Sequence, residues 1–72
     1  MAVDNNEIER RVLDYIQDAI SRHDVPTRQS AIREITGKVE VLPSAVARAI
    51  TGLIEAGKLR QVRDNGDLEL VE

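Results

Sequence analysis

The stretch from residue 43 to residue 56 carries the side chains best suited to bind another molecule. If this stretch is a helix, one of its faces is small and polar and holds Ser44, Ala45, Ala47, Arg48, Thr51 and Glu55. Short side chains let a helix approach another surface closely, and the guanidinium of Arg48 can donate two parallel hydrogen bonds to one partner. The chemistry on offer is therefore recognition through hydrogen bonds.

Side chains for catalysis or metal binding are scarce. The chain has one histidine, His23, and no cysteine, so a thiolate site or a histidine cluster cannot form. Its four glycines do not make a phosphate-binding loop. Tyr15 is the single aromatic residue, which leaves no platform for stacking the bases of a single strand. We therefore expect no enzyme, no cofactor and no metal site.

The periodicity of residues 43–56 predicts the helix itself. Apolar residues recur at the spacing of one helical stripe: Val46, Ala49, Ile50, Leu53 and Ile54. Pro43 suits a first turn because its missing N–H would have no intrahelical partner there, and Gly57 suits the left-handed position that ends a helix. Gly52 lies inside the predicted helix at a cost of about 1 kcal/mol relative to alanine, which indicates close packing or the close approach of a partner.

A β-hairpin should follow this helix, over residues 58–71. Asn65-Gly66 is the strongest kind of short-range hairpin signal, and short, partly alternating runs flank it. A tight two-residue loop would place apolar side chains opposite charged ones. We favour a three-residue loop with a left-handed Gly66, because its register brings apolar side chains face to face, Val62 with Leu68 and Leu59 with Val71.

A first helix is predicted over about residues 5–22. Asp4 and Glu7 stand before it in capping-box spacing. Its apolar arc is wide and comprises Ile8, Val12, Leu13, Tyr15, Ile16, Ala19 and Ile20. We expect this arc to pack against the rest of the domain; the alternative is that Leu13 and Ile20 cover the second subunit of a homodimer.

A short second helix is predicted over about residues 28–36. Thr27 is its expected N-cap and Gly37 its expected end, with Ala31, Ile32 and Ile35 facing inward. Charged neighbours alternate with Val39 and Val41 in the link to the third helix. This link is therefore a candidate for a brief extended piece that pairs with the hairpin.

The bulk composition indicates one domain, residues 1–72, with a small core. No apolar run approaches the roughly 20 residues that span a bilayer, and the N-terminus is acidic where a signal peptide would be basic, so we expect a cytoplasmic protein. The net charge of −3 argues against general nucleic-acid binding. Residues 25–63 nevertheless hold seven Lys or Arg and three Asp or Glu, a local excess of +4.

The order helix, helix, helix, strand, strand resembles the winged helix-turn-helix superfamily. The match is most specific over residues 42–63, where Leu42-Pro43-Ser44-Ala45-Val46-Ala47-Arg48-Ala49-Ile50 looks like a recognition helix and Leu53-Ile54-Glu55-Ala56-Gly57-Lys58-Leu59 looks like the turn into the first wing strand of bacterial and archaeal regulators. The resemblance implies an α+β fold and a small transcriptional regulator that binds double-stranded DNA sequence-specifically. The third helix would lie in the major groove and the wing would contact the backbone.

The resemblance also implies roles for single residues. The third helix would read bases through Ser44, Ala45, Arg48 and Thr51, and Arg48 is the strongest candidate because a guanidinium can bond both O6 and N7 of guanine. The wing would contact DNA through Arg60, Arg63 and Asn65. The start of the second helix would hold a phosphate through side chains and free amides of Thr27, Arg28 and Gln29.

Two features depart from the family pattern and keep alternatives open. The linker between the second and third helices is longer than the usual tight turn, and the acidic Asp64 and Asp67 at the wing tip would repel phosphate. The charge of Arg48 could serve solubility, and Arg60 and Arg63 could pair across strands with Glu69 or Glu72. The alternative function is a winged-helix module that docks on another protein without binding DNA.

Overall fold

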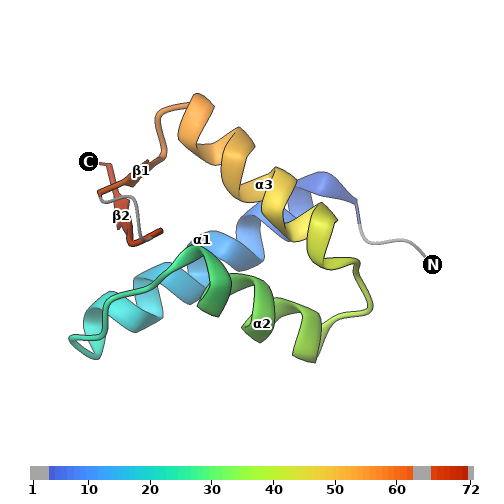
Figure 1. Cartoon of the computed structure of the whole chain (residues 1–72), viewed down its shortest axis with the longest axis horizontal. Helices are drawn as coiled ribbons and strands as arrows, with labels where there is room; N and C mark the ends of the chain where they lie inside the picture. The colour runs from blue at the N-terminus through green and yellow to red at the C-terminus, as the bar shows by residue number, and fades with distance from the viewer. Residues whose placement is uncertain (1–3, 63–65, 72) are drawn as a thin grey trace.

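The computed structural model describes residues 4–62 and 66–71. Helices α1 (Asn5–Ser21), α2 (Arg28–Lys38) and α3 (Pro43–Glu55) are followed by strands β1 (Leu59–Gln61) and β2 (Leu68–Leu70), which pair in an antiparallel hairpin (Figure 1). The predicted α+β class is confirmed, and three helices before a C-terminal hairpin are the layout of a winged helix. Within the described residues, no helix has the length and apolar character needed to cross a membrane.

Apolar residues from all three helices and both strands form one core. It comprises Ile8, Val12, Ile16, Ala31, Ile35, Val46, Ala49, Ile50, Leu53, Leu59 and Leu68. The four that come from α3 are each no more than 1% exposed. Burial of one aliphatic side chain is worth about 1.5–3 kcal/mol, so this stripe fixes the rotation of α3 and turns its opposite, polar face toward solvent.

The wide apolar arc of α1 is used mainly inside the domain. This helix packs against α2, α3 and β2, and Leu13 and Tyr15 are half-buried against the core. Ile20, by contrast, is 42% exposed. Of the two residues predicted to cover a second subunit, Leu13 is therefore partly covered by its own chain and Ile20 remains on the surface.

The helix ends follow the sequence signals with one exception. Asp4 caps α1 by accepting a hydrogen bond from the Glu7 amide at 2.9 Å, and Gly57 has the left-handed φ of +78° after α3. Gly37 does not end α2, as was predicted, because it keeps a helical conformation and the helix continues to Lys38. The chain leaves the helix only at Val39, which is extended. Two residues later, Val41 packs against the core.

The predicted register of the hairpin is wrong by one residue. Leu59 lies opposite Leu70, Arg60 opposite Glu69 and Gln61 opposite Leu68. In this register Leu59, Leu68 and Leu70 share the face that meets the core, whereas the predicted register would turn the two leucines of β2 to the other face. Burial of Leu59 and Leu68, with Leu70 half-buried beside them, therefore outweighs the pairing of Val62, which is 47% exposed. Gly66 is left-handed as predicted, with φ +92°.

The connector after α1, and not the link before α3, pairs with the hairpin. Thr27 forms an isolated antiparallel bridge with Asp67. The Leu68 amide donates to the Pro26 carbonyl at 2.8 Å, and the Arg28 amide donates to the Gly66 carbonyl at 2.9 Å. Residues 39–41, the candidate for such pairing, form no strand pairing with the described part of the hairpin. The hairpin is instead attached to the start of α2.

Candidate nucleic-acid interface

The outward face of α3 is the candidate interface. Its solvent-exposed stripe consists of Ser44, Arg48, Thr51 and Glu55. The fourth predicted base-reading residue, Ala45, lies at the edge of this stripe, where it is half-buried and packs against the core. The structure thus brings Ser44, Arg48 and Thr51 together on one surface.

Arg48 is the cation at the centre of the stripe. It is exposed, and no acidic group lies within ion-pair distance of it among the described residues. A shallow depression between the starts of α1 and α3 lies beside it and is lined by Asn5, Ile8, Leu42, Ser44, Ala45 and Arg48. The guanidinium of Arg48 is therefore available to an acceptor brought from outside.

Arg28 lies on the other side of the stripe, opposite that depression. Its Nη2 donates to the Ala47 carbonyl at 3.3 Å and to Thr51 Oγ1, both on α3. Its Nη1 donates to Gln61 Oε1 on β1 at 3.4 Å. Arg28 and Thr51, both predicted to contact DNA, thus contact each other, and Arg28 connects α2, α3 and the hairpin.

The predicted phosphate site at the start of α2 is largely occupied by the chain itself. Thr27 Oγ1 accepts the Ser30 amide at 3.0 Å, and Ser30 Oγ accepts the Thr27 amide at 2.9 Å, a complete capping box. The Arg28 amide is bonded to Gly66. The prediction of free amides at Thr27 and Arg28 is therefore wrong, because a serine at the third helical position and the hairpin supply the acceptors. Gln29 has an exposed side chain.

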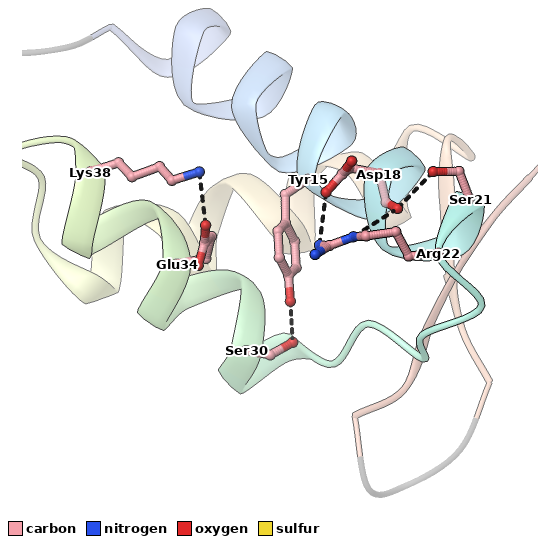
Figure 2. Close-up of polar contacts among 7 residues, drawn as sticks. All are labelled: Tyr15, Asp18, Ser21, Arg22, Ser30, Glu34 and Lys38. Atoms are coloured by element: carbon pink, nitrogen blue, oxygen red, sulfur yellow. Dashed lines mark hydrogen bonds and ion pairs between the residues drawn. The ribbon is translucent and has the colours of Figure 1, made fainter.

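Ser30 is a positioning residue that sequence reasoning missed. Its hydroxyl donates to the Thr27 carbonyl at 3.0 Å and accepts from the Tyr15 hydroxyl at 2.9 Å, so it ties the first turn of α2 to α1 (Figure 2). The spacing Thr27-x-x-Ser30 was the available signal, since a hydroxyl at that position can return the cap's hydrogen bond.

Among the described residues of this basic segment, 25–62, the positive charge does not form one patch. Arg60 forms a close ion pair with Glu69, directly opposite it in the hairpin, as the cross-strand alternative proposed. At the far end of α2, Lys38 Nζ lies 2.8 Å from Glu34 Oε1 (Figure 2). That hydrogen bond and charge hold the pKa of Glu34 below its ordinary value, with a smaller contribution from Arg22. The predicted wing residues Arg63 and Asn65 lie outside the described residues.

The arrangement is suited to non-covalent recognition. The described residues contain no group of three or more His, Cys, Asp or Glu side chains placed to hold a metal ion. They do present a helix whose outer stripe is polar, with short side chains at Ser44 and Thr51, the guanidinium of Arg48 and, at its end, the acidic Glu55. The guanidinium of Arg28 lies beside this stripe. No protein-family model matches the chain, and neither the curated proteins nor the solved structures provide a match.

Proposed function

We propose that this domain binds double-stranded DNA with α3 in the major groove, as a small transcriptional regulator of the winged helix-turn-helix type. The observation that carries the proposal is the outward stripe of α3, with Ser44, Arg48 and Thr51 exposed above a fully buried apolar stripe. The major groove is about 12 Å wide and admits one α-helix. A helix with short outward side chains can approach base edges more closely than one with long side chains.

Arg48 is the residue that would read sequence in this proposal. A guanidinium donates in parallel to O6 and N7 of guanine, a pattern that one base pair presents and the others do not. The absence of an ion pair to Arg48 in the described part of the chain favours this role, because no internal partner must be given up. Ser44, one helical turn before it, would contact a phosphate or a neighbouring base.

The affinity of a single domain should be low. Arg60 is paired with Glu69, which leaves Arg28 and Arg48 as the guanidiniums of the described residues that lie on or beside the stripe. Few phosphate contacts mean a shallow dependence of binding on salt. We therefore include a homodimer in the proposal, with the exposed Ile20 in its interface, which would present two copies of α3 to one site. Sedimentation of the protein alone at micromolar concentration tests the dimer.

Fluorescence anisotropy with labelled duplexes tests the DNA proposal. The chain is titrated into a random-sequence duplex and into a duplex selected from a random library, at low and at moderate salt. The proposal expects binding to both at low salt, weaker at moderate salt, with the selected duplex preferred. Absence of binding at low salt would contradict the proposal.

A second candidate function, docking on another protein, is favoured by one observation. Leu42, at the start of α3, is 71% exposed and lines the depression that also contains Ile8 and Ala45. An apolar side chain of a partner would fit beside Leu42. A chemical-shift map in which a protein partner perturbs Ala45, Ala47 and Arg48, with no response to duplex DNA, would support this function over DNA binding.

A further inference from the structure

We infer that Arg28 is a positioning residue, not a phosphate ligand, and that its guanidinium holds the hairpin against α3 in the arrangement that a DNA groove requires. The inference deepens the proposed function and rests on it. It assigns to Arg28 a role different from the phosphate contact that the sequence predicted.

The side-chain contacts of Arg28, which lies on α2, reach both α3 and β1. Nη2 donates to two acceptors on α3, the Ala47 carbonyl at 3.3 Å and Thr51 Oγ1. Nη1 uses one hydrogen on Gln61 Oε1 of β1, at 3.4 Å. Both terminal nitrogens of the guanidinium are therefore already directed at acceptors of the chain itself.

The main chain of Arg28 holds the hairpin at a second point. Its amide donates to the Gly66 carbonyl at 2.9 Å. A Cβ built on Gly66 would lie 3.5 Å from the Arg28 Cβ, so the end of the hairpin loop packs directly on this residue. Arg28 thus holds the hairpin through the Gly66 carbonyl near the start of β2 and through Gln61 at the end of β1.

The planar shape of the guanidinium is what this role needs. A lysine ammonium would offer one compact charge and could not reach an acceptor on α3 and one on β1 in a single plane. All three acceptors are neutral oxygens, so their hydrogen bonds fix the orientation of the guanidinium without neutralising its charge. The positive charge remains beside the α3 stripe as part of the field, while the donors fix the geometry.

The first experiment needs no DNA. Amide hydrogen exchange and ¹H–¹⁵N shifts are compared for the native chain, Arg28→Lys, Arg28→Ala and Gln61→Ala, with Arg33→Ala as a control that removes an exposed guanidinium from the same helix. Loss of these hydrogen bonds should speed exchange of the β1 and β2 amides by about 3- to 10-fold. Amides of α1 and all amides in Arg33→Ala should change little. Unchanged hairpin amides in both Arg28 variants and in Gln61→Ala would overturn the inference.

The second experiment separates positioning from phosphate binding. The slope of log K against log salt concentration is negative, and each neutralised phosphate adds about 0.9 to its magnitude. A positioning role predicts that Arg28→Lys and Gln61→Ala both weaken duplex binding while this slope is unchanged. If Arg28→Ala lowers the magnitude of the slope by about 1 and Gln61→Ala binds like the native chain, Arg28 is a phosphate ligand and the inference is overturned. If the native chain binds no duplex, the proposed function fails, and the exchange experiment alone decides whether Arg28 holds the hairpin.

Discussion

Sequence recognition in the proposed complex depends most on one side chain, that of Arg48. Replacing it with alanine removes an exposed guanidinium that has no acidic partner in the described part of the chain, so the fold should be undisturbed. We expect Arg48→Ala to weaken binding to a selected duplex by about 1–3 kcal/mol and to relax its base preference. Anisotropy titration measures both.

Arg10→Ala is the matched control for Arg48→Ala. Arg10 is 72% exposed on α1, with carboxylates at 3.9 and 4.0 Å, and its loss changes the net charge by the same amount. Equal losses of affinity for the two variants would mean that Arg48 acts only through the overall charge.

Close packing within the domain does not explain the glycine at position 52. The cost of a glycine inside a helix indicated close packing or the close approach of a partner; within this chain, a Cβ at Gly52 would meet only Glu9 Oε2, at an ordinary 3.5 Å. We therefore expect Gly52→Ala to raise the free energy of unfolding by about 0.5–1 kcal/mol in chemical denaturation. Gly57→Ala is the contrast: its φ of +78° should make that variant less stable by roughly 1–2 kcal/mol. A destabilised Gly52→Ala would show that α3 has no room there.

Among the helices and strands, the sequence predicted those boundaries that a single residue determines by its local chemistry. The start of α3 at Pro43 and the cap of α2 at Thr27 followed from local chemistry and are confirmed. The hairpin register could not be predicted in the same way. The prediction was based on which side chains pair well across the strands, such as Val62, whereas the observed register is the one that places Leu68 in the core. Contacts between distant segments, such as that of Arg28 with Gln61, had no local signal at all.

The capping box of α2 predicts a specific loss of stability. Ser30→Ala removes hydrogen bonds to the Thr27 amide, the Thr27 carbonyl and the Tyr15 hydroxyl. We expect it to lower the free energy of unfolding by about 1–2 kcal/mol, and Tyr15→Phe by about 0.5–1.5 kcal/mol. Ser21→Ala is the control, since that hydroxyl makes an exposed bond at the end of α1 (Figure 2). Equal effects of Ser30→Ala and Ser21→Ala would contradict the positioning role of Ser30.

The pair at the end of α2 predicts a pH dependence. Because the Lys38 side chain lowers the pKa of Glu34 in the folded chain, the ionised carboxylate favours the fold above the pKa that Glu34 has in the unfolded chain. This contribution is lost as the pH falls through the lower, folded pKa. In Lys38→Gln, the pKa of Glu34 measured by carboxyl NMR titration should rise toward its ordinary value. An unchanged Glu34 titration would show that the pair does not persist in solution.

At the scale of the whole molecule, the fold could be predicted more fully than the site. Amphipathic periodicity, caps and one turn were enough for three helices and a hairpin, because burial of apolar stripes has few solutions in so short a chain. The candidate site depends on which charged side chains have no partner within the chain. This depends on the register of the hairpin and on how far long side chains such as that of Arg28 reach, and neither has a local sequence signal. Arg60 was predicted to contact DNA, but its ion pair with Glu69 across the hairpin reduces the positive charge that this residue could offer to a phosphate.

A titration of ¹⁵N-labelled protein with a random-sequence duplex, followed by ¹H–¹⁵N shifts at low salt, tests whether the outward stripe of α3 contacts DNA. We expect shifts concentrated at Ser44, Arg48 and Thr51, with smaller ones at the start of α2 and in β1, and little change on the outer face of α1. No shifts, or shifts confined to α1, would contradict the claim that the outward stripe of α3 binds DNA.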